Sequence, residues 1–283
     1  MPSAGEGKSS LNKAETKKPV ARKLLLKLLG SRAKVKMTAS SAVRVGRLFA
    51  ISENNIRVTI NRLHSAGVLS LVDRGYYQLG KEGVNFAREI NSWRNAETSL
   101  LPSWNGDWVV VYTHMLAKSD KKQARQNDRA LKILGLKKLL PDMYIRPANI
   151  QGGAGVVREK LQVLGLSQQA VVFCAFDLDS KLHLRTRKLW NTAELEQRYQ
   201  QGVTELKESL NRLPTLSLED ATKESFEIGD NALHQLVFDP LLPSPLIDES
   251  LRREFAELVK YYDDIGAQIW HQFLSLDNNY SPG

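Results

Sequence analysis

The segment from Ser52 to Gly67 is the part of this sequence that most restricts the fold. Serine is a favoured first cap of a helix and glycine a common terminator, so the segment predicts one helix between these two residues. Its apolar residues Ile56, Ile60 and Leu63 follow helical spacing and form one narrow face. The rest of the helix surface is therefore expected to be polar and solvent-exposed.

That polar surface carries amide and guanidinium side chains, which form paired hydrogen bonds with adenine and guanine in the major groove of DNA. A short strand is predicted at residues 68–72, a tight turn at 73–75 and a second strand at 76–79. Helix and hairpin together predict a winged helix-turn-helix. The candidate DNA-binding residues are Ser52 as the orienting cap, with Asn54, Asn55, Arg57, Thr59, Asn61, Arg62, Arg74 and Tyr76.

Two further helices are predicted before this segment. Residues 21–29 predict a helix that Gly30 ends, and residues 38–49 predict another, joined to the third by a sharp turn at 50–52. A plain three-helix bundle with a polar surface is the alternative. The order of elements and the short turn favour nucleic-acid binding, with Lys23 and Lys27 expected to contact phosphate.

The charge of the chain is strongly polarised. Residues 1–94 hold 18 Lys and Arg against 6 Asp and Glu, whereas residues 191–283 hold 7 against 17, within a total net charge of +9. Such a chain has one end suited to a polyanion and one acidic end. The basic end coincides with the predicted reader, so the charge pattern favours double-stranded DNA as a partner.

Composition sets further bounds. No apolar run approaches the roughly 20 residues that a membrane-spanning helix needs, so no membrane segment is predicted. Residues 1–19 are rich in Ser, Gly and Lys and predict a disordered basic arm. The one cysteine, Cys174, excludes an internal disulfide and is consistent with the cytoplasm. Because it lies in the apolar run 170–176, a buried strand thiol is predicted.

A mixed unit is predicted after the reader. A helix at 81–94 closes the reader domain (20–94), and a linker at 95–103 leads to a second domain at 104–188. Strands are predicted at 108–112, around 143–145 and at 170–176, with helices at 120–134 and 156–164. This alternation predicts a ferredoxin-like α/β sandwich in which one strand is hard to identify.

Residues 152–155, with the sequence Gly-Gly-Ala-Gly, are predicted to form a flexible loop between strands. Binding of a phosphate group is the alternative, because small residues before a helix expose backbone N–H groups. Arg146, Arg158 and Lys160 lie nearby in the sequence and are weak candidates for binding an effector through the phosphates of coenzyme A.

The third predicted domain, residues 189–275, is helical, and residues 276–283 form a tail. A long helix at 192–213 carries a continuous apolar stripe, and further helices are predicted at 221–237 and 249–274, after an extended Pro-rich segment. The stripe could pack within the chain or against a second subunit, and packing within the chain is favoured. Its members are Leu195, Tyr199, Val203, Leu206, Leu210 and Leu213.

Catalysis is not predicted. The five histidines are scattered, without a metal-binding pair, and no nucleophile elbow is present. The middle domain resembles the small ferredoxin-like nucleases of CRISPR systems, which place a metal-binding Asp at the end of the first strand. Here His114 follows that strand and Asp107 precedes it. The acidic pair Asp177 and Asp179 is interpreted as a solvated turn, so no metal ion or other cofactor is expected.

The order of these parts resembles the PaaX-type regulators, named for the phenylacetate-degradation repressor. The resemblance rests on motifs distributed along the chain: residues 52–57 leading to Arg62 and Gly67, 104–108, 134–136 with 143–147, 189–190, and 239–243. It implies a multidomain α+β protein with an N-terminal winged helix, a ferredoxin-like middle domain and a helical C-terminal domain.

The function implied by this resemblance is that of a homodimeric repressor in aromatic or related carbon catabolism. A small organic effector, of the acyl-CoA type in the namesake, would release such a repressor from DNA. A metal-dependent nuclease and a protein-interaction scaffold without enzymatic activity are the alternatives.

Overall fold

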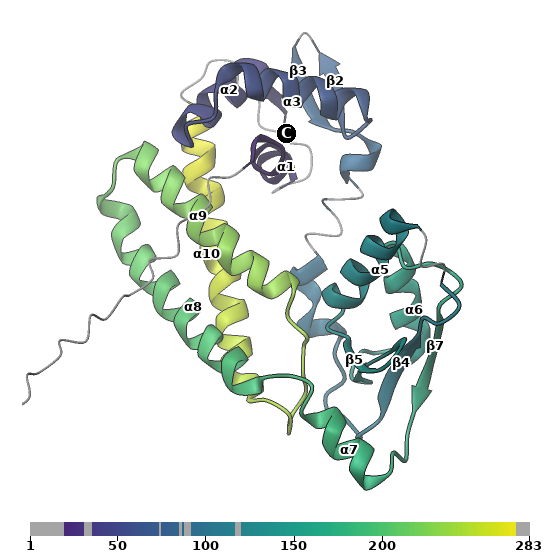
Figure 1. Cartoon of the computed structure of the whole chain (residues 1–283). Helices are drawn as coiled ribbons and strands as arrows, with labels where there is room; N and C mark the ends of the chain where they lie inside the picture. Colours follow the sequence, from purple (N-terminus) through teal and green to yellow (C-terminus); the bar gives the residue numbers. More distant parts are fainter. Residues whose placement is uncertain are drawn as a thin grey trace, which may run out of the picture.

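The computed structural model describes residues 20–30, 36–73, 75–84, 87, 92–116 and 120–275. Within these residues the fold mixes helices with two antiparallel sheets and ends in a helical C-terminal region. Figure 1 shows short helices with a hairpin in one part, an antiparallel sheet with helices in a second part, and a group of long helices in a third. The predicted arm at 1–19 and tail at 276–283 lie outside the described residues.

The N-terminal part contains the predicted helices and hairpin. The helices are α1 (Ala21–Gly30), α2 (Ala39–Leu48) and α3 (Glu53–Ser65). The hairpin consists of β2 (Leu69–Asp73) and β3 (Tyr76–Leu79), and β1 (Met37–Thr38) adds a short strand beside β3, giving the antiparallel order β1-β3-β2. The sequence analysis missed β1, which is only two residues long.

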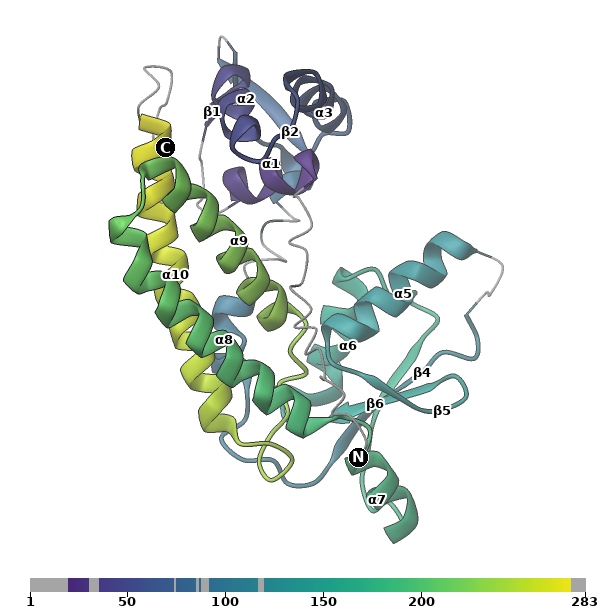
Figure 2. The ribbon, with the colours of Figure 1, turned by 60° about the vertical axis from the view of Figure 1, so that its left-hand side comes forward.

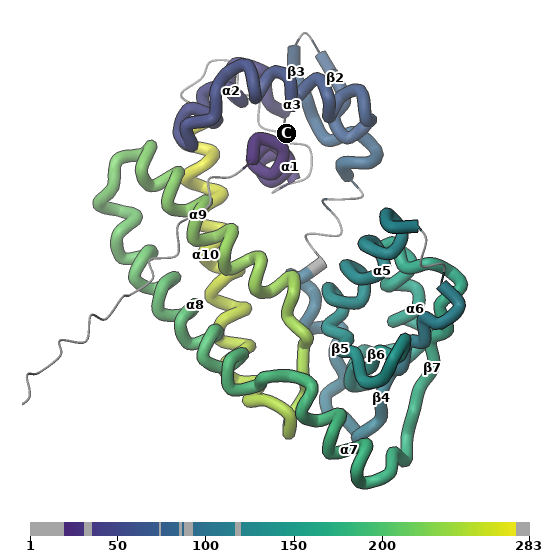
Figure 3. Tube along the Cα trace, in the orientation of Figure 1, coloured from purple at the N-terminus to yellow at the C-terminus, as the bar shows by residue number. Residues whose placement is uncertain are grey.

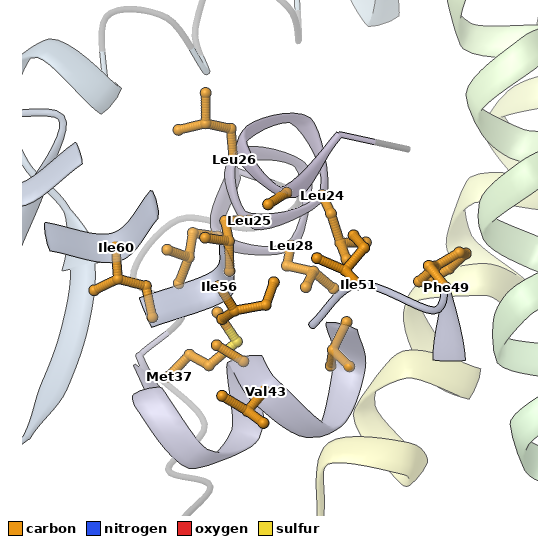
Figure 4. Close-up of a cluster of buried hydrophobic side chains, with 14 of the residues drawn as sticks. Leu24, Leu25, Leu26, Leu28, Met37, Val43, Phe49, Ile51, Ile56 and Ile60 are labelled. Atoms are coloured by element: carbon orange, nitrogen blue, oxygen red, sulfur yellow. The ribbon is translucent and has the colours of Figure 1, made fainter. Parts of the chain in front are cut away.

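The core of this part is continuous with the C-terminal helices. Leu24, Leu25 and Ile56 are fully buried in it, together with Phe226 and Phe273 from the end of the chain. Figure 4 shows Phe49 beside the C-terminal helices, and its ring lies 5.0 Å from that of Phe226. The reader candidate is therefore fixed to the helical region through apolar side chains.

The helix predicted at 81–94 is described only in part. Residues 81–84 are helical, and Ser92–Asn95 form the 3-10 helix η1, so the end of the prediction was wrong in helix type. Residues 85–86 and 88–91 lie outside the described residues. The predicted linker contains a second 3-10 helix, η2 (Glu97–Ser99).

The middle sheet has the antiparallel order β5-β6-β4-β7. Its elements are β4 (Trp108–Tyr112), α5 (Lys121–Ile133), β5 (Lys137–Leu140), β6 (Met143–Pro147), α6 (Gly153–Val163) and β7 (Val171–Ala175). Val109 and Val111 pack with residues of α5 and α6 on one face, whereas Trp108 and Val110 join the core of the C-terminal helices on the other. The strand that the sequence analysis could not identify is β5.

Three predictions in this part were wrong. The segment 152–155 is not an inter-strand loop, because Gly152 is the N-cap of α6 and the helix begins at Gly153. Asp179 does not lie in a simple turn but caps α7 (Ser180–Arg187), a helix that the sequence analysis missed. Cys174 is exposed, not buried. A side chain added at Gly153 would lie 4.0 Å from its sulfur, so the bare start of α6 leaves the thiol uncovered.

The C-terminal region consists of α8 (Thr192–Arg212), the short 3-10 helix η3 (Leu213–Thr215), α9 (Leu218–Val237) and α10 (Glu249–Ser275). The apolar stripe of α8 packs on α9 and α10, which confirms the prediction of packing within the chain. Gly202 permits a close approach, because a Cβ there would lie 2.4 Å from the ring of Phe255. None of the described helices is long and apolar enough to cross a membrane.

The three parts enclose an open angle, which the tube of Figure 3 and the turned view of Figure 2 both show. The long helices α8, α9 and α10 run along one side, and the middle sheet diverges from them. The N-terminal helices lie at the end of α10. This places α1 against α9, whereas α3 faces away from the long helices.

Candidate nucleic-acid interface

Helix α3 has one buried face and one exposed face. Ile56, Ile60 and Leu63 are 0%, 3% and 3% exposed and lie in the N-terminal core. Full burial of such side chains contributes roughly 1.5–3 kcal/mol each, which fixes the rotation of the helix about its axis. On the opposite side, Asn54 and Asn61 are exposed and seven residues apart, so they share one face.

The start of α3 is set by the turn that precedes it. Ser52 accepts a hydrogen bond from the backbone N–H of Asn55 at 3.4 Å, as its predicted role as N-cap requires. Ala50 has a positive φ of 53°, which reverses the chain direction between α2 and α3. Gly46 allows the two helices to approach, since a Cβ there would lie 2.7 Å from the side chain of Ile56. A close helix pair with a short turn results.

Arg57 is bound within its own helix. Its guanidinium lies 2.9 Å from the carboxylate of Glu53, and Arg47 of α2 approaches the same carboxylate at 3.5 Å. The hydrogen bond from Arg57, followed by its charge, lowers the pKa of Glu53. Both arginines are more than half exposed, so a phosphate or base edge can compete with Glu53 for them.

The remaining candidates of α3 differ in accessibility. Arg62 and Asn55 are exposed, whereas Thr59 is half-buried and donates to the amide oxygen of Asn55 at 3.3 Å. Val58 was missed by the sequence analysis, although it is 37% exposed on the same face as Asn54 and Asn61. A small apolar side chain in that position is suited to contact with the methyl group of thymine. The helical period would have identified it.

Of the two candidate DNA-binding residues in the hairpin segment, the structure describes Tyr76. Tyr76 begins β3 and is half-buried, opposite Asp73 of β2. The ammonium of Lys36 lies 3.9 Å from the carboxylate of Asp73, which brings a cation close to β2. Arg74 lies outside the described residues.

The two lysines that were expected to contact phosphate are directed toward the C-terminal helices. Lys23 and Lys27 of α1 both pair with Asp230 of α9, the second at 3.1 Å. That part of the prediction was wrong, because α1 packs against α9 with these side chains.

The three weak candidates for effector binding do not form one open site. Arg146 is 1% exposed and donates to the carbonyl oxygens of Leu134 and Pro147 and to Asn149 at 2.6, 3.2 and 3.0 Å. Burial lowers its pKa to about 10. Arg158 is exposed and donates to the carbonyl of Val172 at 2.6 Å. Burial, and then the charge of Arg146, lowers the pKa of Lys160.

The nuclease alternative would place a metal ligand at the end of β4, where His114 follows the strand and Asp142 approaches from the turn between β5 and β6. His114 lies 3.0 Å from Asp142, and its ring stacks on that of Tyr112. Asp107, at the other end of the strand, accepts a hydrogen bond from Asn105 at 2.7 Å. Among the residues that the structure describes, no three His, Cys, Asp or Glu residues are grouped as metal ligands.

The site therefore consists of a fixed helix with an exposed amide and guanidinium face beside a hairpin, a pattern typical of proteins that bind duplex DNA. Residues 190–272 match the PaaX-like protein C-terminal domain family. The resemblance to the PaaX-type family is thus confirmed, through the helical region. This family indicates a transcriptional regulator.

A solved structure has a similar fold. It is the uncharacterized protein Rv0674 from Mycobacterium tuberculosis, with a TM-score of 0.54 and 18% sequence identity. The similarity covers 88% of this chain and 99% of that chain. At this identity it is evidence for the fold alone. The comparison with curated proteins found no match.

Proposed function

We propose that this protein is a transcriptional repressor that binds duplex DNA through α3, acts as a homodimer in the cytoplasm, and is released from DNA by a small organic effector. In this proposal residues 20–94 form a winged helix-turn-helix domain, residues 104–188 a ferredoxin-like domain and residues 189–275 a helical domain. The strand order β5-β6-β4-β7 in a βαββαβ chain supports the second assignment.

The observation that carries the proposal is the arrangement of α3. Its apolar face is fully used by the core, so its exposed face is free of any packing role. That face presents Asn54, Asn61 and Arg62 beside the arginine pair held by Glu53. Amide groups distinguish adenine by paired hydrogen bonds, and arginine distinguishes guanine.

The other candidates have supporting roles in this proposal. Ser52 orients the helix as its cap, and Asn55 accepts a hydrogen bond from Thr59 on the same helix. Tyr76 begins the second strand of the hairpin and would contact phosphate groups. The same role is proposed for Arg74 from the sequence alone. A homodimer is proposed because one such helix covers too few base pairs for specificity in a genome. An effector of the acyl-CoA type is proposed only from the PaaX-type resemblance.

The proposal is tested by selecting preferred sites from a random duplex library and measuring affinity by fluorescence anisotropy. Asn61→Ala should lose about 1–3 kcal/mol on the selected site, with much less effect on random duplex. The matched control is Asn211→Ala, an exposed asparagine on α8, which should bind like the parent. Equal losses on both duplexes would contradict a reading role for α3.

Oligomeric state is tested separately. Light scattering should give twice the 31.8 kDa mass of the chain, and the selected sites should contain two half-sites in inverted repeat. A monomer that binds a single half-site would contradict the homodimer. Absence of duplex binding together with cleavage of DNA or RNA in Mg²⁺ would favour the nuclease instead.

A further inference from the structure

A cavity of about 500 Å³ lies between α1 of the reader and helices α9 and α10 of the C-terminal region. Its size is within the range of small-molecule sites. Its walls are mainly apolar, and Leu26 from α1, Phe226 and Leu233 from α9, and Trp270 from α10 contribute to them. The cavity thus joins two parts of the chain that the proposed function requires to communicate.

The charged groups of the cavity are unequal in number. Its lining includes four cationic side chains, Arg22, Lys23, Lys27 and Arg129, and only two anionic ones, Asp230 and Asp263. Lys23 and Lys27 share the single carboxylate of Asp230. The excess of positive charge favours an occupant that carries negative charge.

Lys27 lies where the apolar and charged parts of the wall meet. Its ammonium is 3.1 Å from Asp230 and 4.8 Å from the centre of the Phe226 ring. Burial lowers its pKa, against the opposing charge of Asp230. An additional anion at this position would compensate the burial of the ammonium.

We propose that this cavity binds a compact amphipathic carboxylate, with its aromatic or aliphatic body among Leu26, Phe226, Leu233 and Trp270 and its carboxylate beside Lys27 and Lys23. This inference rests on the proposed function only for its regulatory consequence. The ligand site itself follows from the volume, the apolar lining and the excess of cationic groups.

The regulatory consequence follows from the two faces of α1. One face carries Leu24 and Leu25, which are buried in the same core as Ile56 and Ile60 of α3. The other carries Leu26 and Lys27, which line the cavity. A ligand held between α1 and α9 that binds more tightly to the DNA-free arrangement of these helices than to the DNA-bound one therefore lowers DNA affinity by that same factor.

The binding site is tested on the full chain without DNA. The fluorescent probe is 1-anilinonaphthalene-8-sulfonate, and the competitors are 2-naphthoate and its uncharged analogue 2-naphthamide. We expect the probe to bind with increased fluorescence and naphthoate to displace it at least tenfold more effectively than naphthamide. Equal displacement by the two competitors would overturn the assignment of a carboxylate site.

Variants locate the binding. Leu233→Trp and Ala267→Leu each fill part of the cavity and should weaken probe binding, at unchanged helical circular dichroism. Lys27→Met keeps the apolar stem and should remove the preference for naphthoate. Lys207→Met is the matched control, because Lys207 pairs with Glu254 at an exposed site outside the cavity. Unchanged binding in both filled variants would overturn the site.

Two further measurements distinguish a free acid from a thioester as the ligand, and ligand binding from its effect on DNA binding. The ligand inferred for this cavity is a free acid, which differs from the acyl-CoA effector taken from the PaaX-type resemblance. 2-Naphthoyl-CoA should therefore compete less well than naphthoate, and a thioester that binds while the acid does not would overturn the carboxylate. Naphthoate should lower the affinity for the selected duplex in the parent but not in Leu233→Trp. If the chain binds naphthoate but no duplex, the proposed function fails while the ligand site stands.

Discussion

Arg44 of α2 donates a hydrogen bond to the backbone carbonyl of Phe273 at 2.6 Å, and its guanidinium lies 4.5 Å from the centre of the same residue's ring. Phe273 belongs to the last turn of α10, where carbonyl groups lack partners within the helix. A cation there also interacts favourably with the helix dipole. Arg44 therefore caps the C-terminal end of α10 and attaches the N-terminal part of the fold to it.

Replacing Arg44 by alanine should lower the free energy of unfolding by about 1–2 kcal/mol, because a charge-assisted hydrogen bond and a helix-end interaction are both lost. Urea denaturation followed by circular dichroism measures the change. Arg47→Ala is the matched control on the same helix, since its contact with Glu53 is exposed and 3.5 Å long. It should cost less than about 0.5 kcal/mol. Equal costs would contradict the attachment.

The carboxylate of Glu53 pairs with Arg47 and Arg57, and replacing this carboxylate is the basis of a second prediction. Glu53→Gln takes a negative charge away from the face proposed to contact DNA and releases Arg57 and Arg47. Affinity for all duplexes should rise about threefold to tenfold, with a steeper dependence on salt concentration. Anisotropy titrations at several salt concentrations measure both. Glu254→Gln on α10 should have no effect, and a fall in affinity for Glu53→Gln would contradict the proposed interface.

The helices α2, α3 and α8 were predictable because their signals are local. Ser52, Thr38 and Asn191 each accept a hydrogen bond from the first turn of the helix that they cap, and each was followed by an apolar stripe. The stripe of α8 needed only the next two helices to bury it. For the same reason, the exposed face of α3 could be identified from the positions of its buried residues.

The wrong predictions concern residues whose secondary structure, exposure or pairing depends on contacts with residues distant in the sequence. β5 begins with two exposed lysines at the edge of the sheet, so its sequence carries little strand signal. Cys174 lies in an apolar run but is exposed, and the residue of α6 beside its sulfur is Gly153, which has no side chain to cover it. The pairing of Lys23 and Lys27 with Asp230 joins residues about 200 positions apart. No local pattern contains that information, and the cavity between these helices was unpredictable for the same reason.

Arg146 and Arg158 looked equivalent as candidate anion ligands, but the structure gives them different roles. Arg146→Ala removes three hydrogen bonds in the core and leaves the carbonyl of Leu134 and the amide of Asn149 without this donor. We expect the free energy of unfolding to fall by about 3–4 kcal/mol. Arg158→Ala removes one bond at an exposed position and should cost about 1 kcal/mol. Urea denaturation of the two variants compares them, and equal costs would contradict a structural role for Arg146.

The contact between α1 and α9 should depend on pH through Asp230. Burial alone would raise the pKa of this carboxyl, but the charges of Lys27 and Lys23 outweigh burial and lower it below the usual value of 3.8. A carboxyl with a lowered pKa stabilises the fold above its unfolded pKa, and the stabilisation is lost as the pH falls through the folded value. Asp230→Asn should therefore be less stable than the parent by roughly 1–2 kcal/mol at pH 6–7.

This difference between parent and Asp230→Asn should stay constant down to about pH 5 and shrink below about pH 4, where the unfolded chain binds the proton. Urea denaturation of both proteins at pH 7, 5 and 3.5 measures it. Glu254→Gln provides the comparison, because its exposed pair with Lys207 should contribute less than about 0.5 kcal/mol at neutral pH. A difference that grows as the pH falls would have the wrong sign for a carboxylate held between two lysines. It would instead mean that burial, which raises the pKa of Asp230, outweighs the pairing of its carboxylate with the two lysines.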